Sequence, residues 1–267
     1  MSVELHPLNR DFQWRMPAPP YRFVTAEQAA QYDRDGFFAL HGVFSVEEIA
    51  AVRSAIDPLE AQADAYLRTR EHGTLGIARA DDIVFNPHLV NRCELLRDFS
   101  CHPVFAGVAA DLIGGRVRLY WDQLVYKKPD TADEFPWHQD NGYTFIDPQQ
   151  YLTCWVALTD ATVENGCPWV VPGLHHRGTL LHRWTRLGFE CLSIDDAASA
   201  VPIELDAGSV AVFSSLTPHR TGPNLTDGVR KAYILQYAPD GARVFRADGE
   251  SELCAAPDRQ YLIEGDA

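Results

Sequence analysis

The spacing of apolar residues changes near residue 116, and this change constrains the fold more than any other feature of the chain. From Arg116 onward, apolar residues alternate with polar or aromatic ones in short runs, which is the two-residue period of a β-strand. Turn signals such as Asn165-Gly166 separate the runs. Roughly seven or eight short strands without intervening helices are typical of a double-sheet jelly roll. We expect them near 117–125, 137–145, 151–159, 167–171, 201–205, 209–214 and 230–238.

The first 115 residues show helical signals instead. Thr25 with Gln28, and Ser45 with Glu48, form capping-box pairs, and Gly36 can end the helix between them. Further helices are expected over 88–99 and 103–113, and one short strand is expected over 37–40.

The chain therefore predicts a mainly β fold with α-helices, in which a double-stranded β-helix (jelly roll) core carries a helical layer from the N-terminal part. We expect one domain over residues 1–267. Its parts are an N-terminal arm (1–24), a mainly helical layer (25–115), the jelly-roll core (116–240) and a C-terminal tail (241–267).

Charge narrows the classes of partner. The chain has 23 basic and 37 acidic residues and a net charge of −14, and such a field repels phosphate backbones and anionic lipid. We therefore expect no nucleic-acid and no membrane partner, and a polyanionic acyl-CoA substrate is mildly disfavoured. One group of residues fits either a local basic patch or a solvated loop face: Arg177, His182, Arg183 and Arg186. Residues 1–20 lack the apolar segment of a secretory signal, so a cytoplasmic protein is expected.

Three potential metal ligands stand out in the predicted core. They are His138 and Asp140, which are separated by one residue, and the distant His219. On a strand, His138 and Asp140 would point to one face and Gln139 to the other. Two imidazoles and one carboxylate with open positions form the facial triad of non-haem Fe(II) oxygenases. The tripeptide alone is common by chance, so this interpretation depends on its surroundings.

Arg230 is the second unusual residue. It opens the apolar run from Ala232 to Tyr237, which we expect to be a strand. An arginine there is a poor core residue unless it faces an anion, and its planar fork suits a carboxylate. Taken alone, the residue also fits a strand-end arginine that reaches solvent.

In these features the chain resembles the phytanoyl-CoA dioxygenase family of Fe(II)- and 2-oxoglutarate-dependent oxygenases. The resembling segments occur in order over nearly the whole chain: Tyr32 to Phe38, Gly42 to Ser45, Glu47 to Ile49, Lys128-Pro129, Trp137 to Asn141, Trp155 to Leu158, Asn165 to Cys167, Val171 to His175, His219 to Asn224, and Arg230. Leu174 departs from the family pattern, which usually has a small polar residue before the histidine.

The resemblance implies a set of roles and a chemistry. His138, Asp140 and His219 bind iron, Arg230 pairs with the distal carboxylate of 2-oxoglutarate, and Thr221 supplies a hydroxyl to it. The chain is then a non-haem Fe(II)/2-oxoglutarate-dependent dioxygenase, with Fe(II), 2-oxoglutarate and O2 as its cofactor and cosubstrates. Such enzymes release succinate and remove hydrogen from a substrate carbon, with hydroxylation, epimerisation, ring closure or desaturation as the outcome. Halogenating relatives lack the carboxylate ligand, so Asp140 argues against halogenation.

Other residues are candidates for the same pocket, each with a plainer alternative. Gln123 and Lys128 flank one end of the first long strand, in reach of cosubstrate or substrate, although Lys128 equally fits a solvent-facing loop. Trp155 is opposite in parity to its apolar neighbours and fits either a wall of the cosubstrate pocket or the core. Four aromatic residues fit either the substrate cavity or ordinary packing, and three histidines fit either a second metal site or a solvated loop: Tyr143, Phe145, Trp169 and Trp184, then His175, His176 and His182.

The substrate class is inferred by analogy. A short acidic chain without a CoA-sized basic groove is similar to bacterial members that tailor secondary metabolites. We therefore expect a small-molecule substrate, with antibiotic or polyketide tailoring as the function. The alternatives are a phytanoyl-CoA-like or free-acid hydroxylase and a non-catalytic metal- and ligand-binding jelly roll. Thr221 and Arg230 argue against the last, since a non-catalytic barrel needs no carboxylate clamp. The sequence leaves the oligomeric state open.

Overall fold

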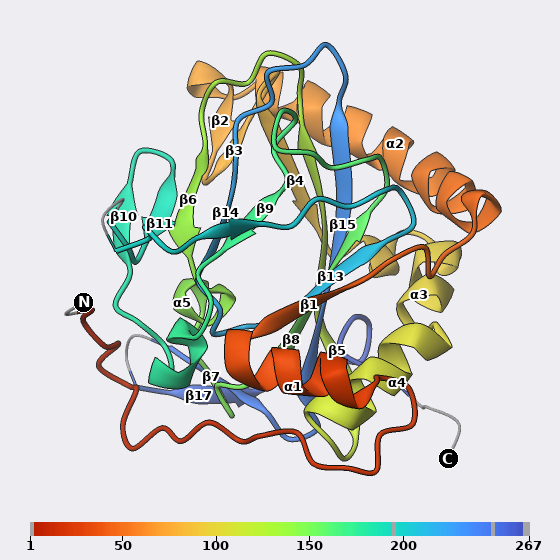
Figure 1. Cartoon of the computed structure of the whole chain (residues 1–267). Helices are drawn as coiled ribbons and strands as arrows, with labels where there is room; N and C mark the ends of the chain where they lie inside the picture. Colours follow the sequence, from red (N-terminus) through yellow and green to blue (C-terminus); the bar gives the residue numbers. More distant parts are fainter. Residues whose placement is uncertain (1–2, 194–195, 247–248, 264–267) are drawn as a thin grey trace.

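A computed structural model describes residues 3–193, 196–246 and 249–263 of the chain. Its largest element is a nine-stranded antiparallel sheet, which joins segments from both ends of the chain (Figure 1). The strand order is β1 (Phe37–Leu40), β13 (Val210–Ser214), β8 (Leu152–Ala157), β15 (Arg230–Pro239), β5 (Val117–Lys127), β4 (Ile83–Pro87), β3 (Ala78–Arg79) and β2 (Thr74–Leu75), and β18 (Leu262–Ile263) pairs with β5.

A second, four-stranded sheet packs against one face of the first. Its order is β12 (Val201–Pro202), β9 (Pro168–Val170), β14 (His219–Thr221) and β6 (Phe135–His138). Phe135 and Val170 of this sheet belong to the same buried apolar cluster as Trp155 and Ile234 of the large sheet. Two smaller antiparallel sheets consist of β10 (Arg183–Thr185) with β11 (Gly188–Glu190), and of β17 (Ser251–Leu253), β16 (Arg243–Phe245) and β7 (Ile146–Asp147).

Helices pack on the other face of the large sheet (Figure 1). The helical elements are α1 (Ala26–Asp35), α2 (Val46–Arg68), α3 (Glu94–Ser100), α4 (Pro103–Leu112), the single turn α5 (Asp140–Tyr143), and the 3-10 helices η1 (Glu71–Gly73), η2 (Leu89–Asn91) and η3 (Leu174–Arg177). The capping boxes predicted at Thr25 and Ser45 are present, and Gly36 ends α1 at a φ of 84°, which glycine adopts without a steric cost. Within the described ranges, no helix combines the length and the apolar character needed to cross a membrane.

Side chains alternate between two buried layers along the central strands. Leu124, Cys154 and Leu235 belong to the cluster that packs on the helices. Their neighbours Val125 and Trp155 belong to the cluster between the two sheets. The large sheet is therefore buried on both faces, and the parity of a residue decides whether it faces the helices or the small sheet.

The predicted mainly β fold with helices is confirmed, but several local predictions are wrong. The segment 25–115 is mainly helical as expected, but it contains more than the one short strand predicted, because β2, β3 and β4 extend the large sheet from it. The run 137–145 is not one strand, since β6 ends at His138 and α5 follows. A 3-10 turn and a break interrupt the helix expected over 88–99, and the strand β14 was not expected. Part of the C-terminal tail returns to the large sheet as β18.

Candidate functional site

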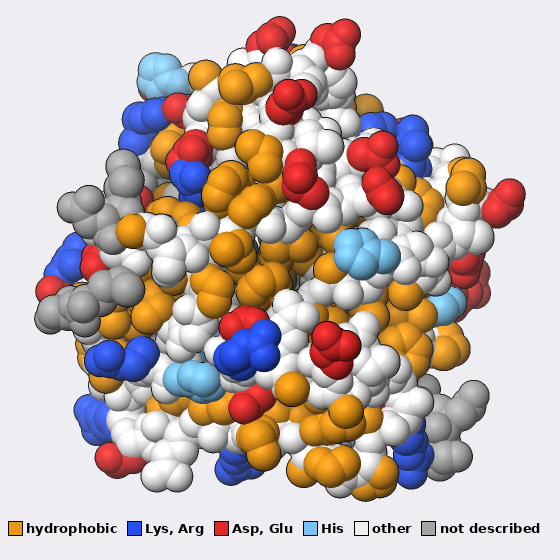
Figure 2. Space-filling view, in the orientation of Figure 1, with side chains coloured by type: hydrophobic (Ala, Val, Ile, Leu, Met, Phe, Trp, Pro, Cys, Tyr) orange, Lys and Arg blue, Asp and Glu red, His pale blue; other side chains and the backbone are white. Residues whose placement is uncertain are grey.

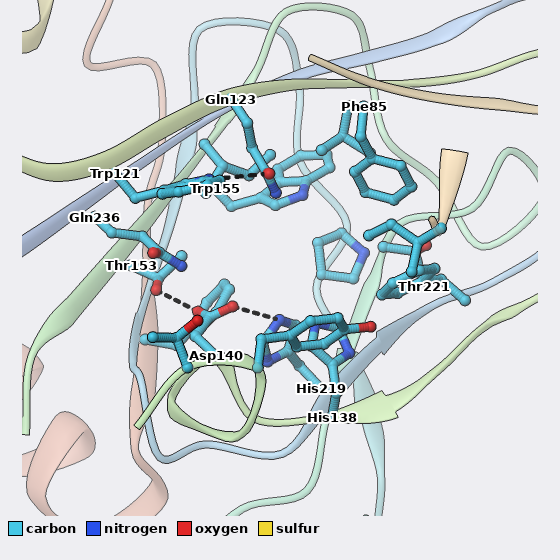
Figure 3. Close-up of a pocket in the computed structure, with 18 of the residues that line it drawn as sticks. Phe85, Trp121, Gln123, His138, Asp140, Thr153, Trp155, His219, Thr221 and Gln236 are labelled. Carbon is cyan, nitrogen blue, oxygen red and sulfur yellow. Dashed lines mark hydrogen bonds and ion pairs between the residues drawn. The ribbon is translucent and has the colours of Figure 1, made fainter. Parts of the chain in front are cut away.

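A cavity of about 250 Å³ opens between the two sheets. Its walls are aromatic and aliphatic side chains with a few neutral polar groups (Figure 3). Among the described residues that line it there is one acidic residue, Asp140, and no lysine or arginine. Apart from Asp140, the surface of the cavity itself therefore carries no carboxylate and no lysine or arginine.

His138, Asp140 and His219 meet at one end of this cavity (Figure 3). One potential ligand atom from each lies within 4.8 Å of the others, and His219 Nε2 is 3.8 Å from Asp140 Oδ1. His138 ends β6 and His219 begins β14, and the two residues are paired in register. Asp140 is not on the strand with His138 as predicted. It begins α5 instead, and this turn directs its carboxylate towards the imidazoles.

Backbone hydrogen bonds fix the tautomer of both imidazoles. His138 Nδ1 donates to the carbonyl oxygen of Pro136 at 2.8 Å, and His219 Nδ1 donates to that of Thr217 at 3.0 Å. A carbonyl oxygen can only accept, so each Nδ1 carries the proton and each Nε2 has a free lone pair. Burial, followed by the neighbouring His219, lowers the pKa of His138 well below its usual value, which favours the neutral form that a metal binds.

A residue on β8, Thr153, orients the carboxylate of Asp140. Thr153 Oγ1 donates a hydrogen bond to Asp140 Oδ2 at 2.5 Å, which leaves Oδ1 as the oxygen nearer to His219. Gln139, between the two ligands, is fully buried and points elsewhere. Its amide nitrogen donates to the carbonyl oxygens of Gly178 and Leu216, which ties β6 to the segment that leads into β14. The donor set thus consists of two imidazoles and one oriented carboxylate, which suits a divalent transition metal.

Arg230 lies behind the cavity wall, completely buried at the start of β15. Its Nε and Nη2 have no hydrogen-bond partner, and Nη1 makes one long contact of 3.4 Å to the carbonyl oxygen of Val125. Its guanidinium carbon is 5.2 Å from the centre of the Trp155 ring. Burial lowers its pKa to about 10, so the group remains a cation at neutral pH. A buried cation with unused donors is costly unless an anion binds it.

Thr221, Trp155 and Gln123 all line the cavity, as their predicted roles require. Thr221 lies two residues after His219, and its hydroxyl oxygen is buried without a partner. Figure 3 places Gln123, Trp155 and Phe85 at the end of the cavity opposite Asp140 and the histidines. Gln123 Oε1 accepts a hydrogen bond from Trp121 Nε1 at 3.0 Å. Orphaned donors and hydroxyls near one cavity are what a site for a carboxylate-bearing molecule contains.

The prediction for Lys128 is wrong. Its Nζ pairs with Glu60 at 2.5 Å and lies 3.7 Å from Asp64, both on α2, and it does not line the cavity. Strand parity explains this outcome, because Lys128 follows β5 on the side of the helices. The preceding Lys127 points to the opposite side and is buried.

Four aromatic residues were suggested for the substrate cavity, and the structure places one of them there. Tyr143 lines it, whereas Phe145 stacks on His6, Trp169 faces Arg220, and Trp184 is exposed. The histidines suggested as a second metal site do not form a metal-binding group among the described residues, where the one such group is the His-Asp-His cluster.

Of the two alternatives for the basic residues near 177–186, the solvated loop face describes Arg183 and Arg186, whose side chains are exposed. His182 is partly buried, and its Nε2 accepts from the Gln139 backbone. Arg183 and Arg186 pair with Glu4 and Asp133. On the face drawn in Figure 2, Lys and Arg side chains are scattered rather than gathered.

Sequence reasoning missed several cavity residues. Thr153 and Gln236 provide its additional polar groups, and Tyr120, Tyr151 and Phe85 provide aromatic walls. Parity could have found Thr153, which is two residues from Trp155, and Gln236, a polar residue inside an apolar strand. Phe85 carried no such signal, because its strand was not predicted.

Comparisons with known proteins give relatives for this arrangement. Residues 32–232 match the phytanoyl-CoA dioxygenase (PhyH) family. A phytanoyl-CoA dioxygenase from Arabidopsis thaliana is 29% identical over 175 residues, which cover 63% of this chain and 61% of the plant protein. An ectoine dioxygenase from Stutzerimonas stutzeri (strain A1501) is 25% identical over 273 residues, which cover 89% of this chain and 87% of that protein.

Solved structures are similar over most of the chain. EctD from S. alaskensis has a TM-score of 0.71 and 25% identity, covering 97% of this chain and 93% of its own. The carbocyclase SnoK from nogalamycin biosynthesis has a TM-score of 0.64 and 25% identity, and the match covers 83% of this chain and 86% of SnoK. The epimerase SnoN, solved with Fe3+, alpha ketoglutarate and nogalamycin RO, shares the fold with a TM-score of 0.69 at 24% identity, covering 89% and 98%.

Proposed function

Because the chain belongs to the phytanoyl-CoA dioxygenase family, and is thus a non-haem Fe(II)/2-oxoglutarate-dependent dioxygenase, we propose that it oxidises a C–H bond of a small secondary metabolite. The proposed context is antibiotic or polyketide tailoring, with hydroxylation, epimerisation or oxidative ring closure as the outcome. One observation carries the proposal: a single apolar cavity has the His-Asp-His cluster at one end and a buried arginine with unused donors behind its wall. We further propose that the two facing sheets form a double-stranded β-helix within one domain.

We assign the binding of Fe(II) to His138, Asp140 and His219. The free Nε2 lone pairs and the oriented Asp140 carboxylate fit this role. When bound, Fe(II) with 2-oxoglutarate and O2 supplies the oxidising power for C–H cleavage, with succinate and carbon dioxide as co-products. The protein's own contribution is to orient these groups, to exclude water and to hold the substrate carbon nearby.

We assign the distal carboxylate of 2-oxoglutarate to Arg230 and Thr221. Arg230 has two unpaired nitrogens and Thr221 an unpaired hydroxyl, so together they can donate to both oxygens of one carboxylate. Trp155 lines the cavity, and the centre of its ring lies 5.2 Å from the guanidinium carbon of Arg230. Gln123 is a further neutral donor at this end of the cavity.

The cavity lining supports an uncharged substrate moiety. Tyr120, Tyr143 and Tyr151 give it aromatic walls, while Gln123 and Gln236 give it amide groups. A free carboxylate on the substrate would find no lysine or arginine among the described lining residues, which disfavours a free-acid hydroxylase. An acyl-CoA hydroxylase stays the alternative, because an acyl chain is also uncharged and relatives named phytanoyl-CoA dioxygenase match this chain.

A substrate screen tests the proposal. Purified enzyme with Fe(II), 2-oxoglutarate and O2 is offered oxygenated aromatic glycosides, free fatty acids and acyl-CoAs, and substrate-dependent succinate is measured. Product mass identifies the outcome, since hydroxylation adds one oxygen, ring closure removes two hydrogens and epimerisation leaves the mass unchanged. Preferential turnover of acyl-CoA would overturn the tailoring proposal. Failure to bind 2-oxoglutarate at all would overturn the assigned cosubstrate site.

A further inference from the structure

A second buried basic side chain lies beside Arg230. Lys127 ends β5, Arg230 opens β15, and the two residues face each other in the register of the large sheet. The Lys127 side chain is 1% exposed and that of Arg230 is 0% exposed. Two cations buried side by side repel each other, and both lose their hydration.

Lys127 is held by backbone oxygens rather than by a carboxylate. Its Nζ donates to the carbonyl oxygen of Asp133 at 3.1 Å and to that of Gly222 by a short hydrogen bond. Gly222 follows Thr221, so Lys127 anchors the end of β14 that carries the unpaired Thr221 hydroxyl. The packing here is close, because a Cβ atom on Gly166 would lie 2.6 Å from the Gly222 oxygen and 3.3 Å from Lys127 Cδ.

The charged groups around Lys127 leave it without a counter-ion. The cations that face it are Arg230 and Arg79, and the carboxylates are Asp82 and Asp133. Asp82 is paired with Arg79, and Asp133 is paired with Arg186 at 3.1 Å.

Cys167, beside Arg230, offers no negative charge either, because burial raises the pKa of its thiol to about 12. Among the described residues, neither Lys127 nor Arg230 forms an ion pair with a carboxylate.

We propose that 2-oxoglutarate supplies the missing negative charge and that its binding draws one proton from solvent onto Lys127. This inference rests on the proposed role of Arg230 as the carboxylate clamp. Lys127 is then a positioning residue, which supports Thr221 through Gly222 and adds its charge to the clamp once it is protonated.

The proton balance is simple. A neutral lysine amine has two N–H groups, which is the number that its two carbonyl partners require. Taking up one proton gives the ammonium with a third N–H and a positive charge. Burial, followed by the charge of Arg230, lowers the pKa of Lys127 to about 7 in the free protein. A bound dianion attracts the ammonium form and raises this pKa, so protons are taken up on binding between the two pKa values.

Calorimetry measures this proton directly. Protein loaded with Mn(II), which binds without turnover, is titrated with 2-oxoglutarate at pH 8 in two buffers of different ionisation enthalpy. For a pKa that moves from about 7 to about 9, uptake is roughly 0.8 proton per site at pH 8. The Kd for 2-oxoglutarate then rises most steeply near pH 8, by about sixfold to sevenfold per pH unit, and levels off above about pH 9. Binding without proton uptake overturns the inference and leaves the proposed function standing, whereas absence of 2-oxoglutarate binding overturns the function itself.

Three variants identify the residue that titrates. Lys127→Arg keeps the charge but does not titrate in this range, so we expect binding without proton uptake and with a flat pH dependence. Lys127→Gln removes the charge, and we expect Kd to rise at least tenfold at pH 7, again without uptake. Lys128→Gln is the matched control, since this lysine pairs with α2 outside the cavity, and it should keep the wild-type uptake. Unchanged uptake in a folded Lys127 variant, judged by its melting temperature, overturns the assignment. If neither Lys127 variant folds, loss of uptake in Arg230→Met supports the coupling, and retained uptake contradicts it.

Discussion

Buried ionisable groups on the two faces of the large sheet differ in the hydrogen bonds that the protein gives them. On the helix side, Asp122 of β5 is fully buried, yet its Oδ2 accepts hydrogen bonds from Leu89 N, Val90 N and the Tyr233 hydroxyl. On the cavity side, Arg230 is equally buried, but its Nε and Nη2 have no partner. The protein thus supplies three donors to Asp122 Oδ2, although Oδ1 has no partner, whereas it leaves two of the three Arg230 guanidinium nitrogens unpaired. Substitutions on the two faces should therefore affect different measurements.

The largest expected effect is that of His219→Ala at the metal end of the cavity. Only two protein ligands would remain, so we expect turnover to fall by at least about a thousandfold while the fold persists. Succinate release and the melting temperature are the measurements. His176→Ala, at an exposed histidine, is the matched control and should stay active. Wild-type turnover in His219→Ala would remove this residue from the metal site.

The second-largest effect is expected for Arg230→Ala, which removes the buried guanidinium whose donors are unpaired. Charge-assisted hydrogen bonds each contribute about 1.5–3 kcal/mol, so loss of the pair should raise the KM for 2-oxoglutarate at least tenfold. Arg230→Lys should recover part of this loss, because an ammonium cannot reproduce the planar fork. An unchanged KM in Arg230→Ala would mean that the clamp lies elsewhere.

Thr221→Val should have a smaller effect on the same constant. A neutral hydroxyl contributes about 0.5–1.5 kcal/mol, which corresponds to a KM for 2-oxoglutarate raised about twofold to thirteenfold. Thr221→Ser retains the hydroxyl and should stay within about twofold of the wild type. Equal KM values in the valine and serine variants would show that the hydroxyl makes no contact with the cosubstrate.

The smallest effect on catalysis is expected on the helix side, at Asp122. Burial raises the pKa of Asp122 to about 6, against an ordinary value of 3.8. The folded state thus binds this proton more tightly, so its stabilising contribution is complete below about pH 4 and is lost as pH rises through about 6. The linkage amounts to at most about 3 kcal/mol.

Asp122→Asn should remove this pH-dependent part of the stability and leave the KM for 2-oxoglutarate within about twofold. Urea unfolding of wild type and variant at pH 4.5 and pH 7.5 gives the difference. Identical pH dependence in both proteins would contradict the role of Asp122. A large change in KM would contradict the separation of the two faces.

The sequence predicted the chemistry of the site better than its geometry. His138, Asp140, His219 and Arg230 were found because their residue types are rare in a core and form an ordered set. The turn between His138 and Asp140 was missed, since a two-residue spacing looks the same on a strand as across a strand end.

Lysines 127 and 128 show a second limit. Adjacent lysines at a strand end are equivalent in composition, and only the parity shared by Gln123, Val125 and Lys127 separates the buried one from its neighbour. The strands of 74–87 were not predicted because β2 and β3 are two residues long, too short to show a period. These strands join the sheet through β4, which pairs with β5 by a long-range contact, and β3 and β2 then follow β4.

Strand β14 has a consequence for which oxo-acid the protein accepts. It carries His219 and Thr221 two positions apart, and both line the cavity. A strand rises about 3.3 Å per residue, so the backbone sets these two side chains roughly 6.6 Å apart along its axis. With the roles proposed above, one end of the cosubstrate would be held at the metal that His219 binds and the other end at Thr221. The strand thus acts as a gauge of molecular length, because oxaloacetate and 2-oxoadipate, one carbon shorter and one longer, would place one end out of register by roughly 1.3 Å.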